Sequence, residues 1–317
     1  MTKNETQNYA QYVNKKTIER FSIRKSVIFG QNIVAGSRIS GLGANLDQIK
    51  NITAINTPNV ENSLMGFGLG MMLNGTDSAF IMKQHDFALL GLDQLTNTVN
   101  VAKNYPISAS FIVIMVVVDS GYEGPQASLN NLDEFASLSR SPVHFLNSKK
   151  NIDRAFESSR HVGLHMMALS QKNMKAPINQ DYDLSESFSA GHFIQSNKSS
   201  SVLIIYFGLD LQYLYQTRDE FLSIGKMSDL FIIAGIGSSI HFDDLNLDKY
   251  GSIIVIDTSK SEITYAQKLV SDLRTTFSNV IHVERIYSDA WGFVSQDLPE
   301  TSPARILEMW TRSQNGK

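Results

Sequence analysis

An eight-residue apolar stretch, FIVIMVVV at residues 111–118, limits the fold more than any other part of the sequence. It lacks the alternation of apolar and polar residues that marks a strand with one face in water. An unbroken β-branched run of this length is typical of a strand buried on both faces, as in a parallel sheet covered by helices. It is too short to cross a bilayer, which takes about 20 apolar residues.

Similar apolar stretches recur along the chain, with helical patterns between them. The expected strands are SVIFG, ITAIN, AFIMK, ASFIVIMVVV and GLHMMALS, followed further on by SVLIIYF, LFIIAGI, SIIVID and VIHVERI. The expected helices cover residues 61–73, 87–103, 133–139, 151–159, 211–222 and 262–276. Strands that alternate with helices form βαβ units, so the sequence predicts an α/β fold with doubly wound sheets.

A polar segment divides this pattern into two parts. Residues 171–201 are rich in Ser, Asn and Lys and show little periodicity, which is typical of an interdomain linker. We therefore expect one α/β domain over residues 1–180, a linker over residues 181–200, and a second α/β domain over residues 201–317.

The composition argues against several classes of protein. Hydrophobic residues make up 42% of the 317 residues and charged residues 19%, which is enough for well-buried cores. The net charge of −3 and the absence of a basic run argue against nucleic acid or an anionic membrane as a partner. The chain has no cysteine, which removes disulfides and thiolate zinc sites, and its polar N-terminus does not resemble a signal peptide. We expect a cytoplasmic protein.

Glu61 stands at a strand-to-helix junction, ahead of an apolar helix that contains Gly66, Gly68 and Gly70. Acids are common in the first turn of a helix, where they favour the helix dipole, so a capping role is one interpretation. The glycines point to a second interpretation, since each costs about 1 kcal/mol in a helix relative to alanine. We expect close approach of another element, either within the chain or in another subunit.

Phe87 follows the next expected strand and opens the next expected helix. An aromatic residue at this position is usually part of the core. Gln84, His85 and Asp86 share the same turn, however. The α/β sheets of proteins bind ligands at the carboxyl ends of their strands, where polar side chains such as these lie.

These segments together carry a family resemblance. VEN at residues 60–62, the glycine-rich helix and FALLGLDQLTN at residues 87–97 resemble the β subunit of E1-type 2-oxo acid dehydrogenases. They are similar, less closely, to the central domain of transketolase and of deoxyxylulose-phosphate synthase. The segment GSRISGLGANL, at residues 36–46, occupies the place of the family's glycine-rich segment. The resemblance implies a pyrimidine-binding domain followed by a transketolase C-terminal-like domain.

The resemblance also implies residue roles and a cofactor, thiamine diphosphate. Glu61 would bond to N1′ of the aminopyrimidine, which favours the tautomer that deprotonates the thiazolium C2. Phe87 would pack against the pyrimidine, with Gln84 and His85 as further cofactor-binding residues. The thiazolium then serves as nucleophile and electron sink in C–C bond cleavage or formation.

One family motif is missing from this chain. The diphosphate and Mg²⁺ of these enzymes are held by a GDG segment and a later asparagine, and the sequence contains no GDG. The chain would therefore supply only the pyrimidine half of the site and no metal ligand. An α-like subunit would hold Mg²⁺ and the diphosphate, in an α2β2 heterotetramer.

The loop EGPQAS, at residues 123–128, resembles the family loop that carries a substrate-handling histidine. Gln126 and Ala127 are the candidate substrate-loop residues, and Ala127 stands where the family has the histidine. Either another residue takes over, such as His85 or one from a partner, or the substrate differs from those of the common members. An inactive homologue is a third interpretation.

The leading functional hypothesis is a β-like subunit of a thiamine-diphosphate oxidoreductase or transferase. It would decarboxylate a 2-oxo acid and pass the acyl unit on, or perform acyloin-type carboligation on a small-molecule acceptor. The alternatives are the C-terminal half of a split transketolase and a non-catalytic scaffold subunit. The phosphate-binding arginines of sugar-phosphate transketolases are not recognisable, which disfavours the former. A nucleotide-binding protein of doubly wound type is a further hypothesis.

Overall fold

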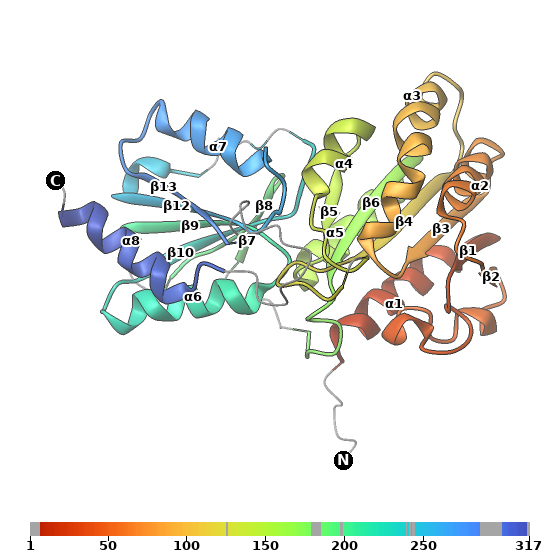
Figure 1. Ribbon diagram of the computed structural model, residues 1–317, viewed down its shortest axis with the longest axis horizontal. Coiled ribbons are helices and arrows are strands. Elements are labelled where there is room, and N and C mark those ends of the chain that lie inside the picture. The colour runs from red at the N-terminus through yellow and green to blue at the C-terminus, as the bar shows by residue number, and fades with distance from the viewer. Residues whose placement is uncertain are drawn as a thin grey trace, which may run out of the picture.

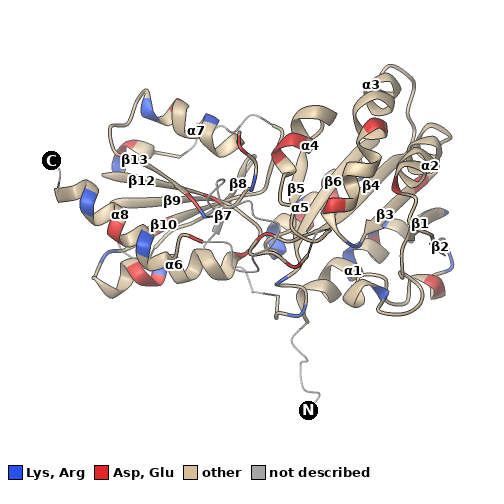
Figure 2. Ribbon diagram, in the orientation of Figure 1, with Lys and Arg blue, Asp and Glu red and all other residues tan. Residues whose placement is uncertain are grey.

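The structure is a computed structural model that describes residues 7–124, 126–178, 185–196, 199–238, 240, 242, 245–285 and 300–315. These residues form two sheets that lie side by side along the long axis of the molecule, each flanked by helices (Figure 1). Acidic and basic residues are interspersed over both parts (Figure 2). None of the helices in the described ranges has the length and apolarity that a bilayer crossing requires.

The first sheet has seven strands in the order β11-β5-β6-β4-β3-β1-β2. Its strands are β1 (Ser26–Gly30), β2 (Ile52–Asn56), β3 (Asp77–Met82), β4 (Ser110–Val117), β5 (Val143–Phe145), β6 (Gly163–Ser170) and β11 (Gly235–Ile236). All pairs are parallel except the pair of β11 with β5. Every residue of the central strand β4 is buried, which confirms the interpretation of the apolar stretch.

Helices cover both faces of this sheet, as expected for a doubly wound fold. They are α1 (Tyr9–Phe21), α2 (Glu61–Leu73), α3 (Val99–Ala102), α4 (Leu132–Ser139) and α5 (Lys149–Ser158). Apolar residues of α1 and α5 belong to one core cluster. Apolar residues of α2, α3 and α4 belong to another, on the opposite face. The sheet therefore forms the middle of three layers.

The second sheet has six strands in the order β13-β12-β9-β10-β8-β7. They are β7 (Ser185–Phe188), β8 (Gly191–Ile194), β9 (Val202–Phe207), β10 (Ser228–Ile233), β12 (Ser252–Asp257) and β13 (Val280–Glu284). Helices α6 (Leu211–Ser223) and α8 (Pro303–Asn315) pack on one face, and α7 (Tyr265–Arg274) packs on the other. The expected α/β class with two doubly wound units is confirmed.

The two halves are joined by more than the chain connection. Residues 185–194, which the sequence placed in a linker, form the β7–β8 hairpin and pair with β10 at the edge of the second sheet. Residues 181–184 and 197–198 of that segment lie outside the described residues. Strand β11, which follows β10 of the second sheet, pairs instead with β5 of the first sheet, where Gly235 lies opposite His144. One core cluster contains residues from both sheets, so the halves share a continuous apolar interior.

The segment at residues 87–103 differs from the single helix expected. It begins as a 3₁₀ helix, η3 (His85–Gly91), continues as a π-helical turn, η4 (Gln94–Thr98), and ends as α3. Gly91 lies directly on α2, where an added Cβ would come within 2.4 Å of the Met65 side chain. The close packing of η3 on α2 therefore interrupts a regular helix at this point.

Candidate functional site

The candidate site residues lie beyond the carboxyl ends of neighbouring parallel strands. Strand β2 ends at Asn56, shortly before Glu61, and β3 ends at Met82, just before Gln84. The loop at residues 123–128 follows β4. Because carboxyl ends of parallel strands meet at one edge of a sheet, the structure gathers these segments along a single edge.

Glu61 is the first residue of α2 and is only 3% exposed. The side chain of Gln31, just after β1, donates a hydrogen bond from Nε2 to Oε1 of Glu61 over 2.9 Å. Within the described ranges, no backbone N–H of α2 donates to this carboxylate. The preceding residue, Val60, gives α2 no side-chain cap. The buried acid is therefore held by an amide side chain from the turn after β1 and does not act as a helix cap.

The glycines of α2 serve different contacts. An added Cβ at Gly68 would lie 2.2 Å from the ring of Phe111 on β4, so Gly68 allows the helix to pack tightly on the sheet. At Gly66 the nearest atoms belong to Gln94 at ordinary contact distance, and at Gly70 there is nothing within 4 Å. We expected these glycines to allow a close contact either within the chain or with another subunit. Gly68 makes such a contact within the chain, while Gly70 faces open space.

Phe87 and Gln84 lie at the start of η3. Phe87 is half-buried and packs against the core cluster that includes α2. Gln84 is 8% exposed and donates from Nε2 to Oε1 of Gln171, which follows β6, over 2.7 Å. Its own Oε1 is buried and has no hydrogen-bond partner among the described residues. Gln84 therefore has an unused acceptor at the edge of the sheet.

His85 is enclosed within the chain. Its side chain is fully buried, and its ring meets the ring of Phe135 on α4 edge to face, with centroids 4.7 Å apart. Neither ring nitrogen has a partner within the described part of the chain. Burial lowers the pKa of His85 to about 3, so the ring is neutral at physiological pH. The structure thus packs His85 against α4, and no hydrogen bond among the described residues links it to Glu61 or Gln84.

The loop that carries Gln126 and Ala127 is fixed by Asp86, the residue after His85. The carboxylate of Asp86 accepts hydrogen bonds from the backbone N–H groups of Ser128, over 3.0 Å, and of Leu129, over 3.3 Å. Gln126 is exposed and Ala127 half-buried, and the N–H of Ala127 donates to the carbonyl of Gly124. The turn after β3 therefore positions the loop after β4.

A lysine from the second half of the chain binds carbonyl groups of the same loop. Lys260 is 4% exposed and follows β12. Its Nζ donates to the carbonyl oxygens of Val118, over 2.9 Å, Gly121, over 2.8 Å, and Ser128. Burial lowers the pKa of Lys260 to about 8. The sequence offered no signal for this lysine, because its partners are carbonyl groups that are remote along the chain.

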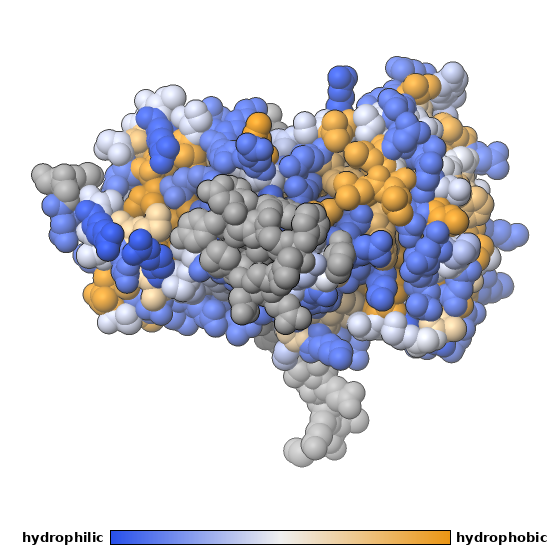
Figure 3. Space-filling view, viewed as in Figure 1, coloured by the Kyte–Doolittle hydropathy of each residue, from blue (hydrophilic) through white to orange (hydrophobic). Residues whose placement is uncertain are grey.

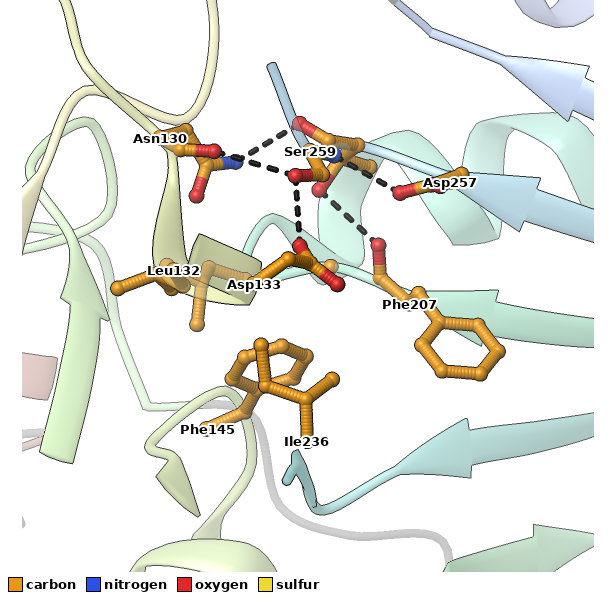
Figure 4. A pocket seen from close by; sticks show the side chains of 11 residues that line it. Asn130, Leu132, Asp133, Phe145, Phe207, Ile236, Asp257 and Ser259 are labelled. Carbon is orange, nitrogen blue, oxygen red and sulfur yellow. Dashed lines mark hydrogen bonds between the residues drawn. The ribbon is translucent and has the colours of Figure 1, made fainter. Parts of the chain in front are cut away.

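Neighbouring residues strengthen this contact between the two halves. Asn130 donates from its amide to the carbonyl of Thr258 over 2.7 Å. Ser259 donates to Asp133 over 2.7 Å and lies between Asn130 and Asp133 in a small interdomain cavity (Figure 4). Burial and the nearby Asp257 raise the pKa of Asp133 to about 7. This cavity is nearly filled, and the residues that line it hold the two halves of the chain together.

The same edge of the first sheet contains a pocket of about 310 Å³. Gln84, Gln171 and Glu123 line it, together with three lysines, Lys83, Lys172 and Lys175. Its position, at the ends of β3, β4 and β6, is where α/β sheets bind small molecules.

Exposed apolar side chains lie on α2 and η3. Phe67 and Leu73 on α2 are 45% and 42% exposed, and Leu89 and Leu90 on η3 are 51% and 60% exposed. Figure 3 shows apolar side chains gathered on the surface between α3 and α4. Contiguous apolar surface of this kind is typical of an interaction face.

Comparisons with solved structures identify the fold. No protein-family model and no curated protein matches the sequence. The structure is similar to a split-gene transketolase in an inactive β4 tetramer, with a TM-score of 0.69 and 11% identity over 96% of this chain and 98% of that chain.

Two longer chains are also similar in structure. One is transketolase from Campylobacter jejuni subsp. jejuni NCTC 11168, with a TM-score of 0.64 and 11% identity over 95% of this chain and 44% of that chain. The other is 2-oxoglutarate:ferredoxin oxidoreductase from Magnetococcus marinus, with 2-oxoglutarate, coenzyme A and succinyl-CoA bound. Its TM-score is 0.62 with 9% identity over 98% of this chain and 64% of that chain. The chain therefore has the two-part transketolase-like fold, which it shares with the split-gene transketolase over nearly its whole length.

Proposed function

We propose that this chain is the β-like subunit of a two-subunit thiamine-diphosphate enzyme that cleaves or forms a C–C bond next to a carbonyl. The observation that carries the proposal is the buried carboxylate of Glu61, held by Gln31 at the strand edge of a transketolase-like domain. Glu61 forms no ion pair with any residue that the structure describes, and a buried acid of this kind is suited to hydrogen-bond a neutral nitrogen heterocycle.

The chain's own residues fit the pyrimidine end of the cofactor. Glu61 would hydrogen-bond N1′ and hold a proton there, while Gln31 fixes the carboxylate in place. Phe87, which is half-buried at the start of η3, would offer a ring face to the pyrimidine. When bound, thiamine diphosphate supplies a nucleophilic thiazolium carbon and an electron sink. Gln126 and Ala127 would lie on the substrate side, on the loop that Asp86 and Lys260 position.

A partner subunit completes the site in this proposal. The sequence has no GDG segment, so an α-like subunit would hold Mg²⁺ and the diphosphate, in an α2β2 assembly. The exposed apolar residues of α2 and η3 offer a face for that contact. The similar split-gene transketolase chain is described as inactive in its β4 tetramer, which supports the need for a second kind of subunit.

The reaction is proposed as 2-oxo acid decarboxylation with acyl transfer, or as acyloin-type carboligation. A split transketolase is the second candidate, favoured by the match over 98% of a split-gene transketolase chain. A scaffold subunit would leave the buried acid without a chemical role.

Calorimetry tests the half-site. The full chain should bind thiamine diphosphate with Mg²⁺ weakly or not at all, and tightly once an α-like subunit with a GDG segment is co-expressed. Glu61→Gln should weaken binding by the assembled pair, while Glu157→Gln, an exposed acid on α5, should not. Tight binding by the lone chain would contradict the proposal, as would equal affinities for the two variants.

A further inference from the structure

Two carboxylates from opposite halves of the chain meet at Ser259. Asp133, on α4 of the first half, accepts a hydrogen bond from the Ser259 hydroxyl over 2.7 Å. Asp257, at the end of β12 in the second half, accepts one from the backbone N–H of the same serine over 2.9 Å. Both acids line the small cavity of Figure 4. The contact between the halves therefore brings two acidic groups onto one residue.

Neither acid is compensated by a lysine or arginine. Asp133 is 7% exposed and Asp257 2% exposed, and neither forms an ion pair with a Lys or Arg that the structure describes. The ring Nε2 of His282, on β13, lies 3.8 Å from Oδ2 of Asp257. Two carboxylates that share a poorly hydrated site repel each other when both are ionised, so one of them retains its proton to a higher pH.

The surroundings of Asp133 assign that proton to it. Burial and the charge of Asp257 raise the pKa of Asp133 to about 7, and Glu134 acts in the same direction. Hydrogen bonds from the N–H of Tyr265, over 2.8 Å, and from Ser259 favour the ionised form but do not offset the burial. Two further charged residues, near the start of α7, line a surface pocket together with Asp133: Glu262 and Lys268.

The same contact connects the second half to the loop after β4. The backbone N–H of Lys260 donates to the carbonyl of Asn130 over 3.0 Å, and the Ser259 hydroxyl lies 3.2 Å from that carbonyl. Further along, the N–H of Gly121 donates to Oε1 of Glu300 over 2.9 Å. If the contact at Ser259 loosens, these neighbouring bonds between the halves weaken with it.

We propose that the contact of Asp133, Ser259 and Asp257 is a pH-sensitive joint, which holds the halves and the loop together while Asp133 keeps its proton and loosens when Asp133 ionises. In an open joint Asp133 lies in water, with its ordinary pKa of about 3.9. The closed joint therefore binds the extra proton between about pH 4 and pH 7, and it must weaken as the pH rises through that range. The inference goes beyond the proposed function and needs no cofactor.

Hydrogen exchange of three backbone amides in the full chain tests the joint. The N–H groups of Tyr265, Lys260 and Gly121 each donate across it. After correction for the intrinsic exchange rate, their opening equilibrium constant should rise by up to about tenfold per pH unit until about pH 7 and then level off, because one proton is released. Global unfolding linked to His85 has the opposite sign, since it weakens the fold at low pH.

A second measurement follows the acid itself. Carbon-13 NMR of the aspartate carboxyl carbons should show one group that titrates near pH 7 in the unmodified chain. This signal should be missing in Asp133→Asn and should titrate at a lower pH in Asp257→Asn, because the neighbouring charge is then removed.

The asparagine variant also imitates the protonated joint. Its amide can accept from Tyr265 and donate to Ser259, whose hydroxyl is then free to donate to the carbonyl of Asn130. The three amides should lose their pH dependence in Asp133→Asn and be at least about tenfold better protected than in the unmodified chain at about pH 8. The matched control is Asp272→Asn, an exposed acid on α7, which should behave like the unmodified chain.

Three results would overturn the inference. These are protection of the three amides that does not change between about pH 5 and pH 8, the absence of an aspartate that titrates above about pH 6, and an unchanged pH dependence in Asp133→Asn. If Asp133→Asn does not fold, an unshifted titration in Asp257→Asn decides against the joint in its place. None of these measurements involves the cofactor, so failure here would leave the test of Glu61 standing.

Discussion

Two of the three glycines of α2, Gly68 and Gly70, predict opposite effects of the same substitution to alanine. In Gly68→Ala the new methyl group would lie 2.2 Å from Cε2 and 2.3 Å from Cζ of Phe111. Phe111 is fully buried and stacks on Phe29, so its ring has little room to withdraw. Overpacking of this kind costs about 1–3 kcal/mol, and the gain in helix propensity offsets about 1 kcal/mol. We expect a net loss of stability of up to about 2 kcal/mol.

Gly70→Ala is the matched control. No atom lies within 4 Å of its Cβ position, so only the gain in helix propensity remains, up to about 1 kcal/mol. Urea unfolding, with equal m-values, should therefore give Gly70→Ala a higher midpoint urea concentration than the unmodified chain. Gly68→Ala should have a lower midpoint than the unmodified chain. Equal midpoints for Gly68→Ala and Gly70→Ala would refute the packing of α2 on β4.

Three further predictions concern the interior and the joint between the halves. The pKa of His85, about 3 in the fold against about 6.5 when unfolded, means that the unfolded chain binds the extra proton between these values. The contribution of His85 to the free energy of unfolding is therefore constant above pH 6.5. Between pH 6.5 and pH 3 that free energy falls by about 1.4 kcal/mol for each pH unit, and His85→Leu should flatten this part of the profile. Lys260→Met leaves three carbonyls without their donor and should cost about 1–3 kcal/mol, with faster amide hydrogen exchange in the loop after β4, whereas Lys226→Met should leave that loop unchanged. Gly235→Ala places a methyl 2.3 Å from the carbonyl oxygen of Val143, so exchange protection of β5 should fall; unchanged protection would show that β11 is not part of the sheet.

Strong local signals predicted much of the fold. The bounds expected for the helix at residues 61–73 are those of α2, because an acid at its start and an apolar run define both ends. The apolar strands β4, β9 and β12 were equally clear, since each is buried throughout. The sequence pattern does not predict helices α1 and α8, because each contains many polar residues and buries only one face.

Contacts between distant segments could not be predicted. Residues 87–103 have a helical pattern, but their packing on α2 divides them into three short pieces. The β7–β8 hairpin lies in a polar segment whose strands are defined by their pairing with β10. Glu61 and Gln84 could be proposed from their places after strands, whereas Gln31 and Lys260 are recognisable only through partners far away in the sequence.

Exchange of the C2 proton of thiamine diphosphate, followed by NMR in deuterated buffer, tests the central claim most directly. The sample is this chain assembled with its α-like subunit, either unmodified or carrying Glu61→Gln. We predict that the substitution slows exchange by about 100-fold or more while the assembly stays intact, because a positioned proton-transfer group contributes at least that factor. Exchange at the unmodified rate in an intact Glu61→Gln assembly would contradict the role assigned to Glu61.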